Sequence, residues 1–240
     1  MRHPARTEVA RPARNRLDAI VLASSGTSVT TPSSARTFDV RHLQLARALF
    51  AAVAAVMVTF STDHSAPVGL SIFSGFALVT GVVFALAVWL VFPRGQRVQP
   101  AVLAALGIVA GLVTSIGTWR SDGLFFGAVI VWALVSGAVE VVGAVRTRRD
   151  PSRADGVRDG LVIGILTLVL GVGLLFTPVQ YALDYYIADA GRTFTLTGIT
   201  IGVGLFGAYS AIVAVYLGIA GLSPRRPEPV PAAPAEETAS

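Results

Sequence analysis

The sequence lacks cysteine and lysine altogether, and only 14% of its 240 residues are charged. Without cysteine, the chain has no disulfide, no thiolate metal ligand and no cysteine nucleophile. Its three histidines, His3, His42 and His64, are scattered and do not have the spacing of metal ligands. We therefore expect no metal site and no bound cofactor.

Catalytic motifs are also missing. The chain has no Walker loop, no His-Glu-x-x-His zinc motif, no Gly-x-Ser-x-Gly elbow and no pair of carboxylates near the mouth of a predicted site. These motifs supply the phosphate cradle, the metal or the nucleophile that common enzyme classes need. The sequence therefore predicts a protein that is not an enzyme.

Long apolar runs are what the chain does have. Hydrophobic residues make up 53% of it and the mean hydropathy is +0.68, whereas about 25% of residues are charged in an average soluble domain. The basic pI, near 10.4, comes from 19 arginines, but no basic face with interleaved aromatic residues is present. We expect a lipid bilayer, and not a nucleic acid, as the partner.

Six apolar runs alternate with short polar breaks. Each run can cross about 30 Å of hydrocarbon, which takes roughly 17 to 25 helical residues. They must be helical, because an open sheet leaves backbone groups unpaired in lipid and a β-barrel needs alternating strands. The sequence predicts an all-α integral membrane protein, in a membrane domain of residues 41–222, with spans at about 43–60, 68–92, 101–119, 123–145, 160–177 and 195–221.

Arginine positions predict the orientation. Seventeen arginines lie in the N-terminal segment through Arg47, in 93–100, in 146–159 and in the C-terminal segment, and only Arg120 and Arg192 lie in the opposite connections. By the positive-inside rule both termini are cytoplasmic, and the protein is expected in the bacterial cytoplasmic (inner) membrane as a multi-pass protein. Trp119 and Trp89 stand where interfacial aromatic anchors are expected.

The two ends of the chain have a different composition. Residues 1–40 are rich in Arg, Ser, Thr and Pro, and residues 223–240 are rich in Pro and Ala. Both are predicted to be disordered cytoplasmic tails. The short apolar stretch 17–23 contains Asp18, which argues against a secretory signal.

A faint internal repeat joins the even-numbered spans. Ala77–Gly81 resembles Ala133–Gly137 at an offset of 56 positions, and Tyr209–Ala211 is a looser third copy. The pattern indicates three similar helical hairpins, each entering from the cytoplasm. Small residues at four-residue spacing either pack helices within one bundle or form a homo-oligomer interface; these pairs are Gly107 and Gly111, Gly160 and Gly164, and Gly198 and Gly202.

Glu140 is the one carboxylate well inside a predicted span. It lies about 9 Å of helix rise from the cytoplasmic edge, and an ionisable group there is a candidate functional residue. Three interpretations stand: an ion pair with Arg47, which is at a matching depth, a proton-carrying role, or snorkelling to the headgroups. The hydroxyls of Thr80, Thr114, Ser136 and Thr167 are expected to bond back to their own helices.

The longest outer connection, 179–192, concentrates polar and aromatic residues. One interpretation is a ligand-facing cap, and the other is an amphipathic piece in the membrane interface with its tyrosines at headgroup level. The candidate residues are Tyr181, Asp184, Tyr185, Tyr186, Asp189 and Arg192.

The stretch 132–178 resembles the HdeD-type acid-resistance proteins, six-helix proteins of the bacterial inner membrane. The matching features are Trp132-Ala-Leu-Val-Ser-Gly137, Glu140, the arginines Arg146, Arg148 and Arg149, a helix starting at Gly160, and Gly171-Val-Gly-Leu-Leu-Phe-Thr-Pro178. The resemblance implies a role in acid or related envelope stress, with no catalytic residues to carry over. Family members often open the helix after the basic loop with Gly-Trp, whereas this chain has Arg158-Asp159-Gly160.

These observations leave three alternative hypotheses for the function. The first is a non-enzymatic, HdeD-like membrane protein that supports the membrane under stress. The second is a small transporter or channel that uses Glu140 and the outer Tyr and Asp segment. The third is an enzyme acting on lipids, for which the sequence offers no acyl-activating or nucleotide-binding motif.

Overall fold

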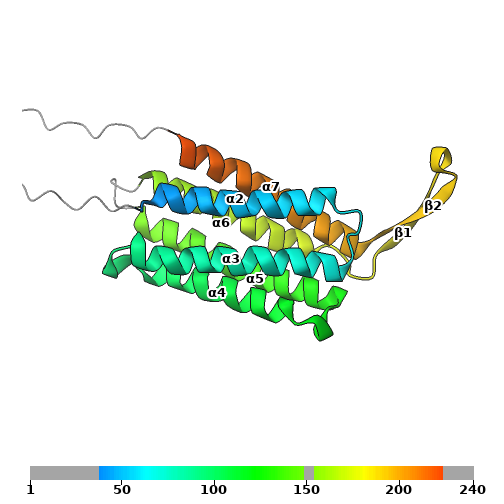
Figure 1. Cartoon of the computed structure of the whole chain (residues 1–240), viewed down its shortest axis with the longest axis horizontal. Helices are drawn as coiled ribbons and strands as arrows, with labels where there is room; N and C mark the ends of the chain where they lie inside the picture. The colour runs from blue at the N-terminus through cyan, green and yellow to red at the C-terminus, as the bar shows by residue number, and fades with distance from the viewer. Residues whose placement is uncertain (1–37, 149–153, 224–240) are drawn as a thin grey trace, which may run out of the picture. The chain divides into compact units, whose positions relative to one another are not determined.

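The structure is a computed structural model that describes residues 38–148 and 154–223. These residues form six long helices and one β-hairpin (Figure 1). The two predicted tails, 1–40 and 223–240, lie almost entirely outside the described residues. The helices are α2 (Val40–Phe60), α3 (Ala66–Leu90), α4 (Val98–Ser115), α5 (Asp122–Thr147), α6 (Ala154–Leu175) and α7 (Gly198–Leu222).

The six described helices coincide with the six predicted spans, and each is long and apolar enough to cross a membrane. The predicted six-helix membrane fold is confirmed. Three boundaries differ clearly from the prediction. Helix α6 starts at Ala154, six residues before the predicted start at Gly160. Helix α4 ends at Ser115 and a 3₁₀ turn, Gly117–Trp119, follows it, while α7 starts at Gly198 because the residues before it form a strand.

Side-chain caps fix where three helices begin. Asp39 caps α2, and the His42 side chain accepts the backbone N–H of Asp39 in return, at 3.2 Å. Ser121 and Thr197 cap α5 and α7 by accepting the backbone N–H of the third helical residue. Such caps satisfy donors that a helix leaves unpaired at its N-terminus. His42 therefore has a structural role at the start of the first span.

The described helices pack most closely as three pairs: α3 with α4, α5 with α6, and α2 with α7. Glycines allow the close approach in each pair. A Cβ on Gly81 would lie 2.8 Å from the Ile108 nitrogen in α4, and one on Gly137 would lie 2.8 Å from the Gly164 oxygen in α6. In lipid, van der Waals packing of this kind drives helix association, because the tails are as apolar as the side chains.

The internal repeat is visible in these pairs. Gly81 and Gly137, at the 56-position offset of the repeat, make the same kind of backbone contact in α3 with α4 and in α5 with α6. The closely packed pairs are shifted by one helix from the predicted hairpins, since the repeated helices α3 and α5 each pack against the helix that follows them in the chain. The third pair joins α7 to α2, the last described helix to the first.

The three Gly-xxx-Gly motifs face other parts of the same bundle, and all their glycines except Gly198, which meets the carbonyl of Pro178 in the connection after α6, face another helix. Gly107 and Gly111 contact α3, Gly164 contacts α5, and Gly202 contacts the ring of Phe126 in α5. The interpretation as packing within the bundle therefore accounts for these glycines. A homo-oligomer stays a prediction, and it would need a different surface.

The segment predicted as a cap or an interfacial piece contains a β-hairpin, which the sequence did not predict. Strand β1 (Ala182–Ile187) pairs antiparallel with β2 (Arg192–Thr197), and a 3₁₀ turn at Ala188–Ala190 joins them. Gly191 closes the turn with φ of 61°, a left-handed conformation that favours glycine. The hairpin projects from one end of the bundle (Figure 1).

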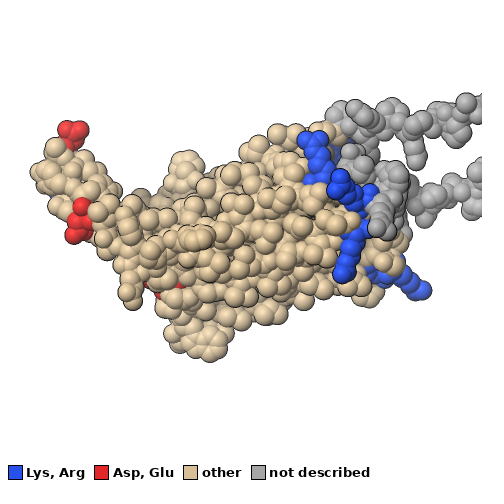
Figure 2. Space-filling model, turned by 180° about the vertical axis from the view of Figure 1, so that it is seen from behind, with Lys and Arg blue, Asp and Glu red and all other residues tan. Residues whose placement is uncertain are grey.

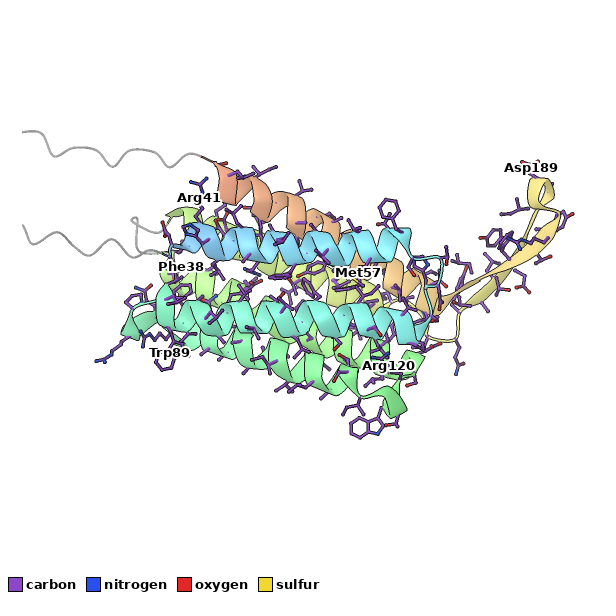
Figure 3. All side chains as sticks on the ribbon, viewed as in Figure 1. Phe38, Arg41, Met57, Trp89, Arg120 and Asp189 are labelled. Atoms are coloured by element: carbon purple, nitrogen blue, oxygen red, sulfur yellow. The ribbon has the colours of Figure 1, made fainter. Side chains whose placement is uncertain are left out.

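Charge is separated between the two ends of the bundle. On the face shown in Figure 2, arginine side chains gather at the end opposite the hairpin, while acidic side chains lie on the hairpin. Trp89 and Trp119 are 78% and 60% exposed, as interfacial anchors are, and Figure 3 shows Trp89 on the outside of the bundle at the arginine-bearing end. This distribution fits the predicted orientation, with the hairpin on the outer side.

A cysteine-free chain allows a direct test of orientation. A single cysteine at Asp189, at the tip of the hairpin, is expected to react with a membrane-impermeant thiol reagent in intact cells, because the predicted orientation puts the tip outside. A cysteine at Gly95, exposed in the turn between α3 and α4, is expected to react only after the cells are permeabilised. The reverse labelling pattern would show that the protein is inserted the other way round.

Candidate functional site

Arg47 and Glu140 form an ion pair inside the bundle. The Nη2 of Arg47 donates to Oε1 of Glu140 at 2.7 Å, joining α2 to α5. The side chains of Arg47 and Glu140 are 16% and 6% exposed, so the protein shields most of the ion pair from lipid and water. The structure thus brings together the two residues whose pairing the sequence predicted from their depth. Buried charges require a partner, because an isolated charge is very costly in a medium of low dielectric.

Phe84 holds the guanidinium from the other side. The ring centre lies 4.6 Å from Cζ of Arg47, a distance at which a cation over an aromatic face is stabilised. Phe84 and Glu140 are 56 positions apart, so they occupy equivalent positions in two copies of the repeat. Arg47 therefore contacts the same position of α3 and of α5, through a ring in one and a carboxylate in the other.

A small cavity adjoins the ion pair. It has a volume of about 20 Å³, and residues of all six described helices line it. The polar groups among them come from five helices, and the rest are apolar side chains and one glycine. The lining residues are Arg47, Phe76, Thr80, Phe84, Leu103, Gly107, Trp132, Ser136, Glu140, Thr167, Tyr209 and Val213.

Two of the four intramembrane hydroxyls behave as predicted. Thr114 donates to the Ala110 carbonyl at 2.8 Å and Thr167 to the Ile163 carbonyl at 2.7 Å, each within its own helix. Thr167 also shares a hydrogen bond with the Tyr209 hydroxyl at 3.0 Å, which links α6 to α7. Tyr209 is a member of the site that the sequence analysis did not single out as a polar group.

The prediction for the other two hydroxyls is wrong. Thr80 and Ser136 are buried, and their oxygens have no hydrogen-bond partner among the described residues. Both hydroxyls line the cavity beside Glu140 and do not bond to a backbone carbonyl of their own helix. Ser210, in the third copy of the repeat, is likewise buried and without a partner in the described part of the chain, but it is not among the lining residues.

An aromatic cluster closes the site on the side of the hairpin. Phe73 and Phe76 of α3 each make edge-to-face contacts with Trp132 and Phe206, with centroids 5.4 to 5.7 Å apart. These residues precede Thr80, Ser136 and Tyr209 in helices that run from the hairpin end. The polar site is therefore separated from that end by packed rings, which sequence periodicity does not reveal.

A second polar junction lies nearer the arginine-bearing end. Asp159 accepts hydrogen bonds from Gln44 of α2 and, at 3.0 Å, from the Tyr216 hydroxyl of α7. The sequence predicts a fifth span that begins at Gly160, with Asp159 in the loop before it, whereas α6 begins at Ala154 and carries Asp159 into this contact. Arg41 donates from Nε to the Gly221 carbonyl at the same end, where Figure 3 shows it.

The outer candidate residues are divided between the two faces of the hairpin. Tyr185 stacks on Phe194, and Arg192 lies over that ring at 4.7 Å, on one face. The Asp184 carboxylate accepts from Thr195 on the other face, together with Tyr186. Tyr181 precedes β1, and Figure 3 shows Asp189 at the tip. The six residues do not converge on one pocket, and they lie at the opposite end of the bundle from Asp159.

Metal binding has no support in the geometry. Among residues 38–148 and 154–223, no three His, Cys, Asp or Glu side chains are close enough together to hold a metal ion. Glu140, the deepest carboxylate of the site, has a guanidinium and not a second carboxylate as its neighbour.

Comparison of the chain with protein-family models, with curated proteins and with solved structures finds no match. The resemblance to the HdeD-type proteins therefore stays a prediction. Function has to be inferred from the polar site itself.

Proposed function

We propose that the chain is a non-enzymatic integral membrane protein of the bacterial cytoplasmic membrane, similar to the HdeD-type proteins, that supports survival of acid or related envelope stress. The observation that carries the proposal is the buried site around Arg47 and Glu140, at the junction of all six described helices. An ionisable pair at this depth is expensive to keep in a membrane and usually marks the working part of the protein.

The size of the site supports a role without an organic substrate. Pockets for small molecules usually measure about 300 to 1,000 Å³. The cavity beside Glu140, at about 20 Å³, is far smaller. The carboxylate is already bound by Arg47, and rings of Phe73, Phe76, Trp132 and Phe206 fill the space on the hairpin side. The site is suited to water or protons and to holding the helices together.

Survival of an acid challenge tests this proposal. A strain that lacks the gene is expected to die faster than its parent, and the natural protein is expected to restore survival. A Glu140→Gln variant is expected to fail, because it keeps the shape of the side chain but removes the charge that Arg47 requires.

The control is Gly75→Ala, a change in α3 where an added Cβ meets nothing within 4 Å. It is expected to restore survival fully, at the same membrane abundance as the natural protein on an immunoblot. Normal survival of the deletion strain would contradict the proposed role in stress survival. Full rescue by Glu140→Gln would show that the charge of Glu140, and so the ion pair with Arg47, is not needed for survival.

The second candidate function is passage of protons or another small cation. The unpartnered hydroxyls of Thr80 and Ser136 beside Glu140 favour it, because such groups line proton and ion pathways in membrane proteins. Purified protein in liposomes loaded with a pH-sensitive dye separates the two functions. Dissipation of a pH gradient by the natural protein, and not by Glu140→Gln, would favour transport. A gradient that persists in both would exclude passive proton conduction.

A further inference from the structure

The cavity beside Glu140 is lined by two hydroxyls and a carboxylate that have hydrogen-bonding positions left over. The hydroxyls of Thr80 and Ser136 have no partner among the described residues. Arg47 bonds to Oε1 of Glu140, which leaves Oε2 without a bond from the described side chains. A buried polar group without a partner costs about 1–3 kcal/mol, and proteins generally avoid this cost by placing ordered water at such points.

The cavity has the size of one water molecule. A site needs about 10–15 Å³ of water-accessible volume to hold one water and has to offer two to four polar partners. The observed volume is about 20 Å³, and Thr80, Ser136 and Glu140 supply three oxygens. Two hydroxyls that can each donate or accept and one carboxylate oxygen that accepts can satisfy three of the four hydrogen-bonding positions of one water molecule.

A cation fits the same place less well. Arg47 already neutralises Glu140, and its guanidinium lies in the lining of the cavity, so no uncompensated negative charge is available to replace a cation's hydration shell. An organic molecule is excluded by size. Water is the ligand that agrees with the charge, the volume and the hydrogen-bonding groups together.

We propose that this cavity is a binding site for one structural water molecule, which bridges the hydroxyls of Thr80 and Ser136 to the free carboxylate oxygen of Glu140. The water joins α3 to α5 beside the Arg47–Glu140 ion pair, so the carboxylate is held by Arg47 through one oxygen and by the water through the other. It also places an exchangeable proton next to Glu140, closed off from the hairpin end by the aromatic cluster. The biological role of this water rests on the proposed function, because it belongs to the same site around Glu140.

The sign of a stability change tests the site. Thr80→Val keeps the shape of the side chain and removes only the hydroxyl. If a water is bound, the variant loses one of its hydrogen bonds, and the melting temperature of the purified protein in lipid nanodiscs is expected to fall by about 2–4 °C, as a loss near 1 kcal/mol produces in a protein of this size. In a dry cavity the same variant removes an unsatisfied hydroxyl, so the melting temperature would rise.

Serine variants provide a matched pair. Ser136→Ala, in the cavity, is expected to lower the melting temperature, whereas Ser210→Ala, buried and unpartnered away from the lining, is expected to leave it unchanged or raise it. Because Thr80 and Ser136 share one water, the loss in the double variant is expected to be smaller than the sum of the two single losses.

Two results would overturn the proposal. One is a rise in melting temperature for Thr80→Val together with equal responses of Ser136→Ala and Ser210→Ala. The other is stabilisation of the natural protein by sodium, relative to choline, that Thr80→Val abolishes, which would make this a cation site. These measurements use purified protein and do not depend on the survival assay. The water site can therefore be refuted while the survival phenotype is confirmed, or confirmed while the phenotype is absent.

Discussion

Replacing Glu140 with leucine is expected to lower the free energy of unfolding by about 3–5 kcal/mol, because the change leaves the Arg47 guanidinium buried without a partner. An arginine cannot relieve this by losing its proton, since it stays charged in proteins. Phe84 still contacts the cation, but a ring does not replace a carboxylate. Reversible unfolding of the purified protein by denaturing detergent in mixed micelles measures the loss.

The control removes both charges. Arg47→Met combined with Glu140→Leu is expected to recover most of the lost stability, because buried ion pairs can often be replaced by apolar side chains of similar volume at little cost. If Glu140→Leu unfolds like the natural protein, the ion pair does not stabilise the bundle. If the double variant is as unstable as the single one, packing at these positions and not charge is responsible.

Replacing Gly137 with valine is expected to be the second most damaging change. A Cβ at this position would lie 2.8 Å from the Gly164 oxygen and 2.9 Å from the Leu168 nitrogen, which are backbone atoms of α6 that cannot turn aside. The pair α5 and α6 would have to separate, and overpacking of this kind costs about 1–3 kcal/mol or more. The same detergent titration measures the effect.

Gly127 in the same helix supplies the comparison. An added Cβ there meets nothing within 4 Å, so Gly127→Ala is expected to leave stability unchanged or to raise it, since alanine favours helix over glycine by about 1 kcal/mol. Equal losses for Gly137→Val and Gly127→Ala would show that α5 depends on glycine for its conformation and not for its contact with α6.

The membrane spans and the ion pair could be predicted because both depend on position along single helices. Hydropathy and arginine counts place the ends of α2 and α5, and these ends place Arg47 and Glu140 at the same depth. The hydroxyls of Thr80 and Ser136 could not be predicted in this way. Their orientation depends on how α3 and α5 rotate against the other helices, which a single helix does not encode.

The hairpin was missed although the sequence carries a signal for it. Threonine alternates with Arg192, Phe194 and Leu196 up to Thr197, as expected for a strand with one apolar face, and Gly191 precedes it at the turn. The prediction instead extended the last membrane span back to 195, because apolar residues continue into α7. Asp159 was missed for the related reason that the fifth span was predicted to start at Gly160, whereas α6 starts at Ala154 and includes Asp159.

The close packing of α2 against α7 has a consequence for how the protein is made. Gly207 and Gly221 of α7 fit against Val58 and Leu45 of α2, so the first described span has its main neighbour in a helix that is synthesised after the four described spans between them. During insertion, α2 must therefore remain in the membrane with its alanine-rich contact surface uncovered until α7 has followed. The six-helix bundle can close only after α7 has been inserted, so the four described spans between α2 and α7 enter the membrane before α2 has its main partner.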